Sequence, residues 1–393
     1  MIPHVRALLV LVVVVMVVAV AGCGSGTVGP GDDGGGTPAV DAPPGSAVDA
    51  RVGGPDGPTP TGDPATGPGD GSNLTCGGAS FSTNATFYQD ISNATLDPES
   101  DTIMNALDAI GWADPGSQQD LGIDFSFEIN CADSGVARRA YVQNGDNQPD
   151  CDFAPVPLVP GGKTEGSGDY ECSGGDCHLI VYQSGRLYEL YQADVTGGMA
   201  TGGDFTGTCL AIWDLAHDYW DPATNPSPNY SRGDACDGGN AADLPIAPML
   251  ITREELQAAI DGDGIIHHAL RFTMKNSRIR SSGYVHPATH YGFGGTTGGE
   301  DTLPTGARLR LRGDYPLGDL PNDEARVVAR TLQRYGMYLA DGGNIYISAT
   351  TDASDLVGRT AVGALRPHDF QMVDGGRRIA RHDYDCNRTP ITN

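Results

Sequence analysis

Eight cysteines between residues 76 and 386 constrain this chain more than any other feature. At the N-terminus Arg6 precedes an unbroken apolar run, Ala7 to Val20, which is typical of an export signal. An even number of cysteines in an exported chain favours disulfides, and no pair of C-x2-C motifs points to metal-binding cysteines. We therefore expect four disulfides. Short loop closure favours Cys172–Cys177, then Cys131–Cys151 and Cys209–Cys236, which leaves Cys76–Cys386 to tie the ends of the domain together.

The apolar run ends in Val20-Ala21-Gly22-Cys23, which resembles a bacterial lipobox. The resemblance implies a lipoprotein signal peptide over residues 1–22, cleavage before Cys23 and lipidation of that cysteine. The run is short for a transmembrane helix, so an uncleaved anchor is the weaker alternative. Gly24 follows the cysteine in place of Asp, which in diderm bacteria implies sorting to the outer membrane. We expect an exported protein of the cell envelope, on the periplasmic or the cell-surface face.

Residues 23–75 are rich in Gly, Pro, Asp and Thr and contain almost no aromatic or branched apolar residues. Such a segment buries too little apolar surface to offset its chain entropy, so we expect a disordered tether. A flexible coil of about 50 residues has a mean span of roughly 40 Å. The folded domain is then residues 76–393.

The formal charge of −26 and the pI near 4.4 argue against nucleic acid as a partner, because nucleic acid requires a basic face. One stretch departs from this balance. Gly264 to Tyr291 contains four histidines, three arginines and a lysine, but no Asp or Glu. A basic island in an acidic chain is a candidate site for an acidic ligand.

Short β-rich segments separated by glycine turns predict a mainly β fold. We expect a single β-sandwich domain, jelly-roll-like, with a few peripheral helices. The expected strands are residues 137–142, 178–182, 187–191, 266–274, 307–312 and 344–349. The expected helices are residues 100–110, a short one opened by a capping box at Thr252, and a longer one that Asn322 caps and Gly342 ends. Residues 194–248 are predicted to be a long, ordered loop.

From about Phe87 onward the chain resembles a family of secreted bacterial proteins without an established activity. The matching motifs are Gly175-Asp-Cys-His178, Leu187-Tyr-Glu-Leu190, Leu244-Pro-Ile-Ala-Pro248, His268-Ala-Leu-Arg-Phe-Thr273, Pro287-Ala-x-His290, Gly306-x-Arg-Leu-Arg-Leu311, Arg334-Tyr-Gly-Met337 and Ala340-Asp-Gly-Gly-Asn344. The resemblance implies a β-rich secreted domain and supplies no reaction. Where the family has W-P-A-R-H, this chain has His286-Pro-Ala-Thr-His290, which changes what that part of a site would bind.

A pair of carboxylates could hydrolyse a glycosidic bond, because such enzymes need one protonated acid and one ionised carboxylate. Glu189, on a predicted strand beside Tyr188, and Asp341, at a predicted helix end, are the candidates. The alternative is that both are paired or capping carboxylates. The tryptophans of the long loop, Trp213 and Trp220, could stack on sugar rings or simply hold the loop to the domain.

Proton abstraction from an acidic sugar is a second possibility, with His268 or His290 as the base and Arg271 neutralising the substrate carboxylate. His268 and Arg271 lie on opposite faces of an ideal strand, which counts against it. A third possibility is a zinc ion bound by His178, His268 and His290, but the spacing of these histidines matches no metal motif. We expect neither a metal nor a cofactor, and His178 and Tyr188 are assigned to ligand binding.

Two functional hypotheses follow for the domain. One is a surface enzyme, hydrolase or lyase, that processes polysaccharide near the cell. The other is a non-catalytic lipoprotein that binds a glycan or a protein. The enzyme hypothesis predicts that one cleft is lined by Glu189, His268, Arg271, His290 and Asp341. If these side chains are dispersed, the catalytic hypothesis fails.

Overall fold

The computed structural model describes residues 75–393 apart from residues 114–115, 117, 145–148, 173, 199–201, 220–231, 234, 237, 292–294, 381–385 and 387. All of the described residues belong to one compact unit, Asp63–Asn393. Within them, no helix has the length and apolar character needed to cross a membrane. Cys23 and Trp220 lie outside the described residues.

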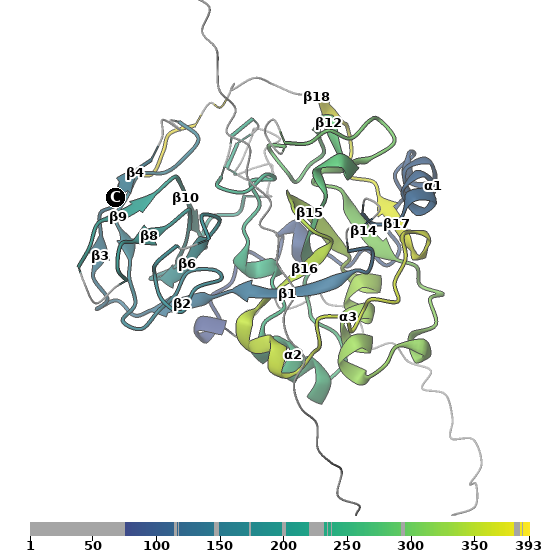
Figure 1. Cartoon of the computed structure of the whole chain (residues 1–393), viewed down its shortest axis with the longest axis horizontal. Coiled ribbons are helices and arrows are strands. Elements are labelled where there is room, and N and C mark those ends of the chain that lie inside the picture. The colour runs from purple at the N-terminus through teal and green to yellow at the C-terminus, as the bar shows by residue number, and fades with distance from the viewer. Residues whose placement is uncertain are drawn as a thin grey trace, which may run out of the picture. The chain divides into compact units, whose positions relative to one another are not determined.

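The largest sheet has six strands and mixes parallel with antiparallel neighbours (Figure 1). In spatial order the strands are β1 (Gly122–Phe127), β16 (Tyr346–Thr350), β11 (Leu270–Met274), β15 (Met337–Gly342), β14 (Arg308–Leu311) and β17 (Phe370–Val373). Strand β1 is parallel to β16, and β11 is parallel to β15. These parallel pairs make the sheet more mixed than the antiparallel sheets of a jelly roll.

A second sheet has four strands, in the order β10 (Cys209–Asp214), β7 (Arg186–Tyr191), β6 (His178–Gln183) and β2 (Ile129–Ala132). Three small sheets complete the described chain. They consist of β13 (Leu303–Thr305), β12 (Ile279–Tyr284) and β18 (Ile379–Ala380); of β3 (Arg138–Arg139) and β5 (Val156–Pro157); and of β4 (Val142–Gln143), β9 (Phe205–Gly207) and β8 (Asp194–Val195). In Figure 1 the labelled strands from β2 to β10 lie together on the left.

Three α-helices accompany the sheets in the described chain, namely α1 (Ser100–Ile110), α2 (Arg253–Asp261) and α3 (Asp323–Arg334). Their apolar stripes pack on the face of the six-stranded sheet that carries Phe272 and Leu339. The side chain of Thr252 accepts from Glu255 N and caps α2, and that of Asn322 accepts from Ala325 N and caps α3. Both caps are as the sequence predicts.

Alternation along the strands divides the interior into layers. Strands β6, β7 and β10 turn one set of side chains, including Ile180 and Trp213, toward a core that also contains Tyr338 and Ala340 of β15. Their alternate side chains, such as Tyr188, enter a separate core beneath the small sheets. Residues from both large sheets therefore share one core, and the predicted mainly β class is confirmed.

The disulfides only partly follow the predicted pairing. Cys172–Cys177 is confirmed. The other three pairings are wrong, because the structure joins Cys76 to Cys131, Cys151 to Cys209 and Cys236 to Cys386. The prediction used distance along the chain, whereas sheet pairing decides which cysteines meet. Asp152, next to Cys151, forms a bridge with Leu210, next to Cys209.

Four segments differ from the predicted elements. The predicted strand 266–274 begins only at Leu270, and the predicted strand 137–142 is divided between β3 and β4, which belong to different sheets. The predicted long helix ends at Arg334, and the residues before Gly342 form strand β15. Gly336 ends the helix instead: its φ of 68° is left-handed, and its N–H donates to the carbonyl of Thr331. The predicted loop 194–248 contains three strands, so Trp213 lies on β10 and not on a loop.

Candidate functional site

A cavity of about 720 Å³ is lined by residues from both large sheets. We call it the sheet cavity. It brings together four of the predicted site residues, namely His178, Arg271, His290 and Asp341. Further lining residues include Asp124, Phe127, Glu165, Asp176, Tyr191, Asn276, Tyr346 and Ser348.

An irregular register between β11 and β15 places Asp341 at this cavity. Phe272 pairs with Leu339, but the next residue, Thr273, pairs with Asp341 instead of Ala340. The extra residue shifts the alternation of β15, so Asp341 joins Thr273 among the cavity residues. Asp341 therefore lies at the end of a strand, and the predicted helix end is wrong.

Arg271 lines the cavity and is held there by two side-chain contacts. Its Nη2 donates to Asp341 Oδ2 at 3.1 Å and its Nη1 to Ser348 Oγ at 2.9 Å. The guanidinium also lies over the Phe127 ring, 5.3 Å from its centroid. Because its Nη groups already donate to Asp341 and Ser348, Arg271 is poorly placed to bind a substrate carboxylate.

His178 and Glu165 form a second ion pair. His178 Nδ1 lies 2.6 Å from Glu165 Oε2, and His178 Nε2 lies 3.1 Å from the carbonyl oxygen of Gly239. Both partners are acceptors, so both ring nitrogens carry hydrogens and the ring is an imidazolium. Glu165 raises the pKa of His178 against the opposing effect of burial. His178 is thus a fixed cation and not a base or a metal ligand.

The two carboxyl groups of these pairs have pKa values displaced in opposite directions. Burial raises the pKa of Asp341 and outweighs the opposing influence of Arg271 and His178. For Glu165 the same burial is outweighed by His178, Arg271 and the Ser126 hydroxyl, so its pKa is lowered. Both side chains remain partly accessible, Asp341 by 28% and Glu165 by 15%.

The charges around the sheet cavity sum to a negative value. Four carboxylates, Asp124, Glu165, Asp176 and Asp341, face one arginine and one imidazolium. The formal sum over these described residues is −4 + 2 = −2 with Asp341 ionised and −3 + 2 = −1 with Asp341 protonated, so it is negative in both states. The basic island of the sequence does not make this cavity basic, since Arg278 and Arg280 do not line it.

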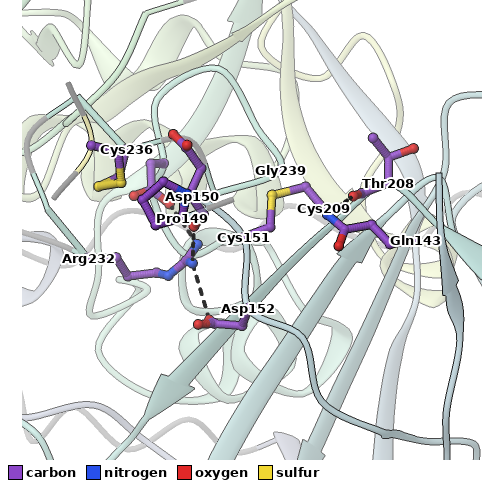
Figure 2. Close-up of a disulfide and its surroundings, with 12 residues drawn as sticks. Gln143, Pro149, Asp150, Cys151, Asp152, Thr208, Cys209, Arg232, Cys236 and Gly239 are labelled. Carbon is purple, nitrogen blue, oxygen red and sulfur yellow. Dashed lines mark hydrogen bonds and ion pairs between the residues drawn. A yellow bond between two sulfur atoms is a disulfide. The ribbon is translucent and has the colours of Figure 1, made fainter. Parts of the chain in front are cut away.

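Aromatic rings and a disulfide complete the walls. His178 lies between Phe127 and Tyr191, with ring centroids 6.1 and 5.1 Å away. Cys209, Thr208 and Gly239 also line the cavity. Figure 2 shows the Cys151–Cys209 disulfide beside them. Gly239, whose carbonyl holds His178, packs against Cys209, because a Cβ at Gly239 would lie 3.2 Å from the Cys209 carbonyl oxygen.

Next to the disulfide, Arg232 donates to the carbonyl of Asp150 and pairs with the fully buried Asp152 at 3.2 Å, as Figure 2 shows. Asp152 also accepts from Arg388 Nη2 at 2.5 Å and from Ile391 N at 2.7 Å. This buried network attaches the C-terminal segment to the strand that carries Cys209.

Glu189 does not line the cavity. It is buried, and it accepts hydrogen bonds from Ile246 N at 2.7 Å, Ala247 N at 2.9 Å and Trp213 Nε1 at 3.1 Å. Burial raises its pKa. The prediction that Glu189 faces a ligand is corrected, because these donors make it a structural link between β7 and residues 246–247.

His268 lies elsewhere too. It is buried, with Nε2 3.4 Å from Glu255 of α2 and Nδ1 2.9 Å from its neighbour's carbonyl. Glu255 raises its pKa against the effect of burial. His268 therefore joins α2 to the start of β11, and the predicted lyase pair of His268 and Arg271 does not converge.

The aromatic ligand contacts predicted from the sequence are also internal. Tyr188 and Trp213 are buried in two different cores. His290 does line the cavity and stacks on Tyr291 at 5.5 Å. No group of three or more His, Cys, Asp or Glu suited to a metal occurs among the described residues.

Glu165 is the main residue that sequence reasoning missed. It lies outside any strand or helix, after Lys163 and Thr164, where no periodicity marks it. The sequence did mark Asp176, since this residue belongs to the Gly175-Asp-Cys-His178 motif that also supplies His178.

No protein-family model, curated protein or solved structure matches the chain.

Proposed function

We propose that the sheet cavity binds a glycan and hydrolyses it, with Asp341 as general acid and Glu165 as the ionised carboxylate. The observation that carries the proposal is that two carboxyl groups on one cavity have pKa values displaced in opposite directions. Glycoside hydrolysis requires one carboxyl that keeps its proton to a higher pH and a second that stays ionised, and these directions match that requirement.

Each carboxyl then has a defined task. Asp341, protonated, donates its proton to the leaving glycosidic oxygen, and Glu165 activates a water molecule or attacks the anomeric carbon. Arg271 positions Asp341, and His178 keeps Glu165 ionised. Tyr191 and Tyr346 offer rings on which the apolar face of a sugar could stack.

The charge of the cavity favours a neutral or amino sugar over a uronate. A negative sum over the lining residues repels a carboxylated substrate, and Arg271 is already paired. Of the two enzyme hypotheses, the hydrolase is therefore better supported than the lyase.

The proposal is tested by incubating the folded chain with neutral, amino and acidic polysaccharides while reducing ends and unsaturated products are measured. We expect reducing ends without unsaturated products. Asp341→Asn should lower kcat/KM by about 100-fold or more, because general acid catalysis contributes on that order. Asp355→Asn is the matched control, since Asp355 is an exposed residue that pairs with the exposed Arg253 and does not line the sheet cavity.

One observation favours non-catalytic glycan binding as the second candidate. Both carboxyls are engaged in close ion pairs, Asp341 with Arg271 and Glu165 with His178. In a binding protein these pairs would only shape the cavity. Saturable glycan binding without any reducing-end release by the unmodified chain would establish this candidate and exclude hydrolysis.

Anchoring at Cys23 completes the proposed function. A lipid on this residue would hold the domain at the outer membrane by a tether, where it meets polysaccharides of the envelope or surroundings. Metabolic labelling with a fatty acid, followed by Cys23→Ser, tests the anchor. Label that persists in the serine variant would contradict it.

A further inference from the structure

A second cavity, of about 400 Å³, is lined by three arginines and no carboxylate. We call it the arginine pocket. It shares no lining residue with the sheet cavity. Arg330 and Arg334 come from α3, one turn apart on one face, and Arg310 comes from β14, on which α3 packs. Ser92 and Gln333 add polar groups to the wall.

Two of the three arginines are fixed by contacts behind the pocket. Arg310 Nη1 donates to the carbonyls of Ile91 at 2.6 Å and Ser92 at 2.8 Å, and its Nη2 donates to Gln371 at 3.1 Å. Arg334 Nε donates to Asp90 at 2.9 Å. The acceptors in these contacts are backbone carbonyls, one side-chain amide and one carboxylate. The combined positive charge of Arg310 and Arg334 is therefore only partly neutralised.

Arg330 is different, because its side chain makes no hydrogen bond or ion pair with any described residue. Its guanidinium lies against Gly264, where a Cβ would come within 2.7 Å of Nη1. A chain with 50 acidic and 24 basic residues offers ample partners for a surface arginine. Arg330 instead lines a cavity together with two other arginines.

The balance of charge at the pocket is positive. The three arginines contribute +3, and Asp90, bonded to Arg334 and Ser92, contributes −1. Asp263, which precedes Gly264, lies 2.9 Å from His267 and does not line the pocket. The helix dipole favours a cation in the last turn and so accounts for Arg334, but Arg330 lies one turn earlier.

We propose that the arginine pocket binds a tetrahedral oxyanion, a phosphate or sulfate group. Such a group has enough oxygens to accept from three guanidinium groups at once, whereas a carboxylate has only two. Arg330 supplies the free guanidinium, and Arg310 and Arg334 are held in place by their other contacts. The site is independent of the proposed hydrolysis.

Isothermal titration of the folded domain with inorganic phosphate and with sulfate tests the site, with acetate as the carboxylate probe. We expect saturable binding of phosphate or sulfate that exceeds acetate binding, weakens with added chloride and is lost in Arg330→Glu. Arg330→Gln should weaken it by about tenfold, and Arg330→Lys by less, because lysine keeps the charge but loses the forked geometry.

Arg326→Gln is the matched control, since Arg326 lies one turn earlier on α3, pairs with Asp323 and does not line the pocket. It should bind phosphate as the unmodified chain does. Equal affinity in Arg330→Gln and Arg326→Gln would overturn the proposal, and so would the absence of saturable binding of either tetrahedral anion. Glucose 6-phosphate and a sulfated monosaccharide then distinguish a free anion from one carried on a sugar.

Discussion

His178 and Glu165 show how burial and pairing together determine charge at the sheet cavity. Each carries a desolvation penalty that opposes ionisation, and each is ionised because the other lies 2.6 Å away. A buried pair of this kind contributes little net stability as a pair. Removing one partner is costly, because the other charge is left without compensation.

Glu165→Gln should therefore lower the free energy of unfolding by about 3 kcal/mol near neutral pH. Chemical denaturation measures the loss. Glu128→Gln is the control, because Glu128 pairs with the exposed Lys163 at 3.6 Å and a surface pair contributes about 1 kcal/mol or less. Equal losses in the two variants would show that the buried pair does not exist as described.

The same pair predicts a pH window. Glu165 has a lowered pKa, so its contribution is present above the unfolded pKa and is lost as pH falls through the folded value. His178 has a raised pKa, so its contribution is present below the unfolded pKa and is lost as pH rises through the folded value. The stability difference between the unmodified chain and Glu165→Gln should be largest between these limits. A difference independent of pH would contradict the pairing.

At the scale of single residues, the sequence indicates part of the candidate site. Arg271 stands out because a charged residue in an apolar strand needs a partner. Asp341 was chosen as a carboxylate at a predicted helix end, although it lies on β15. Glu189 shows the same pattern as Arg271 but has its partners inside the core, from Ile246 and Ala247. Only tertiary structure distinguishes a carboxylate that faces a cavity from one that faces backbone amides.

At the scale of elements, the side-chain caps of α2 and α3 and the periodicity of several strands were predictable. Helix α1 has the predicted bounds, and β6 and β7 agree within one residue at each end. The register shift between β11 and β15, which places Asp341, has no signal in one sequence. The end of α3 was mistaken because Leu339 fits the helical stripe as well as the alternation of β15.

The cap of α3 provides a prediction for an element. Asn322→Ala removes the acceptor for Ala325 N, which lies 2.9 Å from Asn322 Oδ1. We expect a loss of about 1 kcal/mol in the free energy of unfolding, measured in urea, because that is the usual cost of losing a side-chain cap. Asn322→Asp keeps an acceptor and should retain most of the stability. An alanine variant as stable as the aspartate variant would show that the cap is dispensable.

At the scale of the whole molecule, the disulfides join segments that are far apart in sequence. Cys236–Cys386 spans 150 residues and reaches the C-terminal segment that Asp152 also holds, whereas Cys172–Cys177 spans only 5. Sequence spacing could not reveal the long pairings, because they depend on which strands become neighbours.

Loop-closure entropy predicts unequal effects of removing these two disulfides. Replacing Cys236 and Cys386 by serine should cost about 4 kcal/mol or more, and replacing Cys172 and Cys177 about 2 kcal/mol, since a longer loop gains more freedom in the unfolded chain. Unfolding in guanidinium measures both. The account would be contradicted if removing Cys172–Cys177 lowered the free energy of unfolding more than removing Cys236–Cys386.

The most direct measurement of the central claim is a carboxyl NMR titration of Asp341 and Glu165 in the folded domain, with Asp341→Asn and Glu165→Gln used for assignment. The ordinary pKa of an aspartate is 3.8 and that of a glutamate is 4.5, so the aspartate normally titrates at the lower pH. If the sheet cavity holds one protonated acid and one ionised carboxylate, the order is reversed and Asp341 takes up its proton at a higher pH than Glu165. Asp341 titrating below Glu165 would contradict the assignment of acid and base, and with it the proposed hydrolysis.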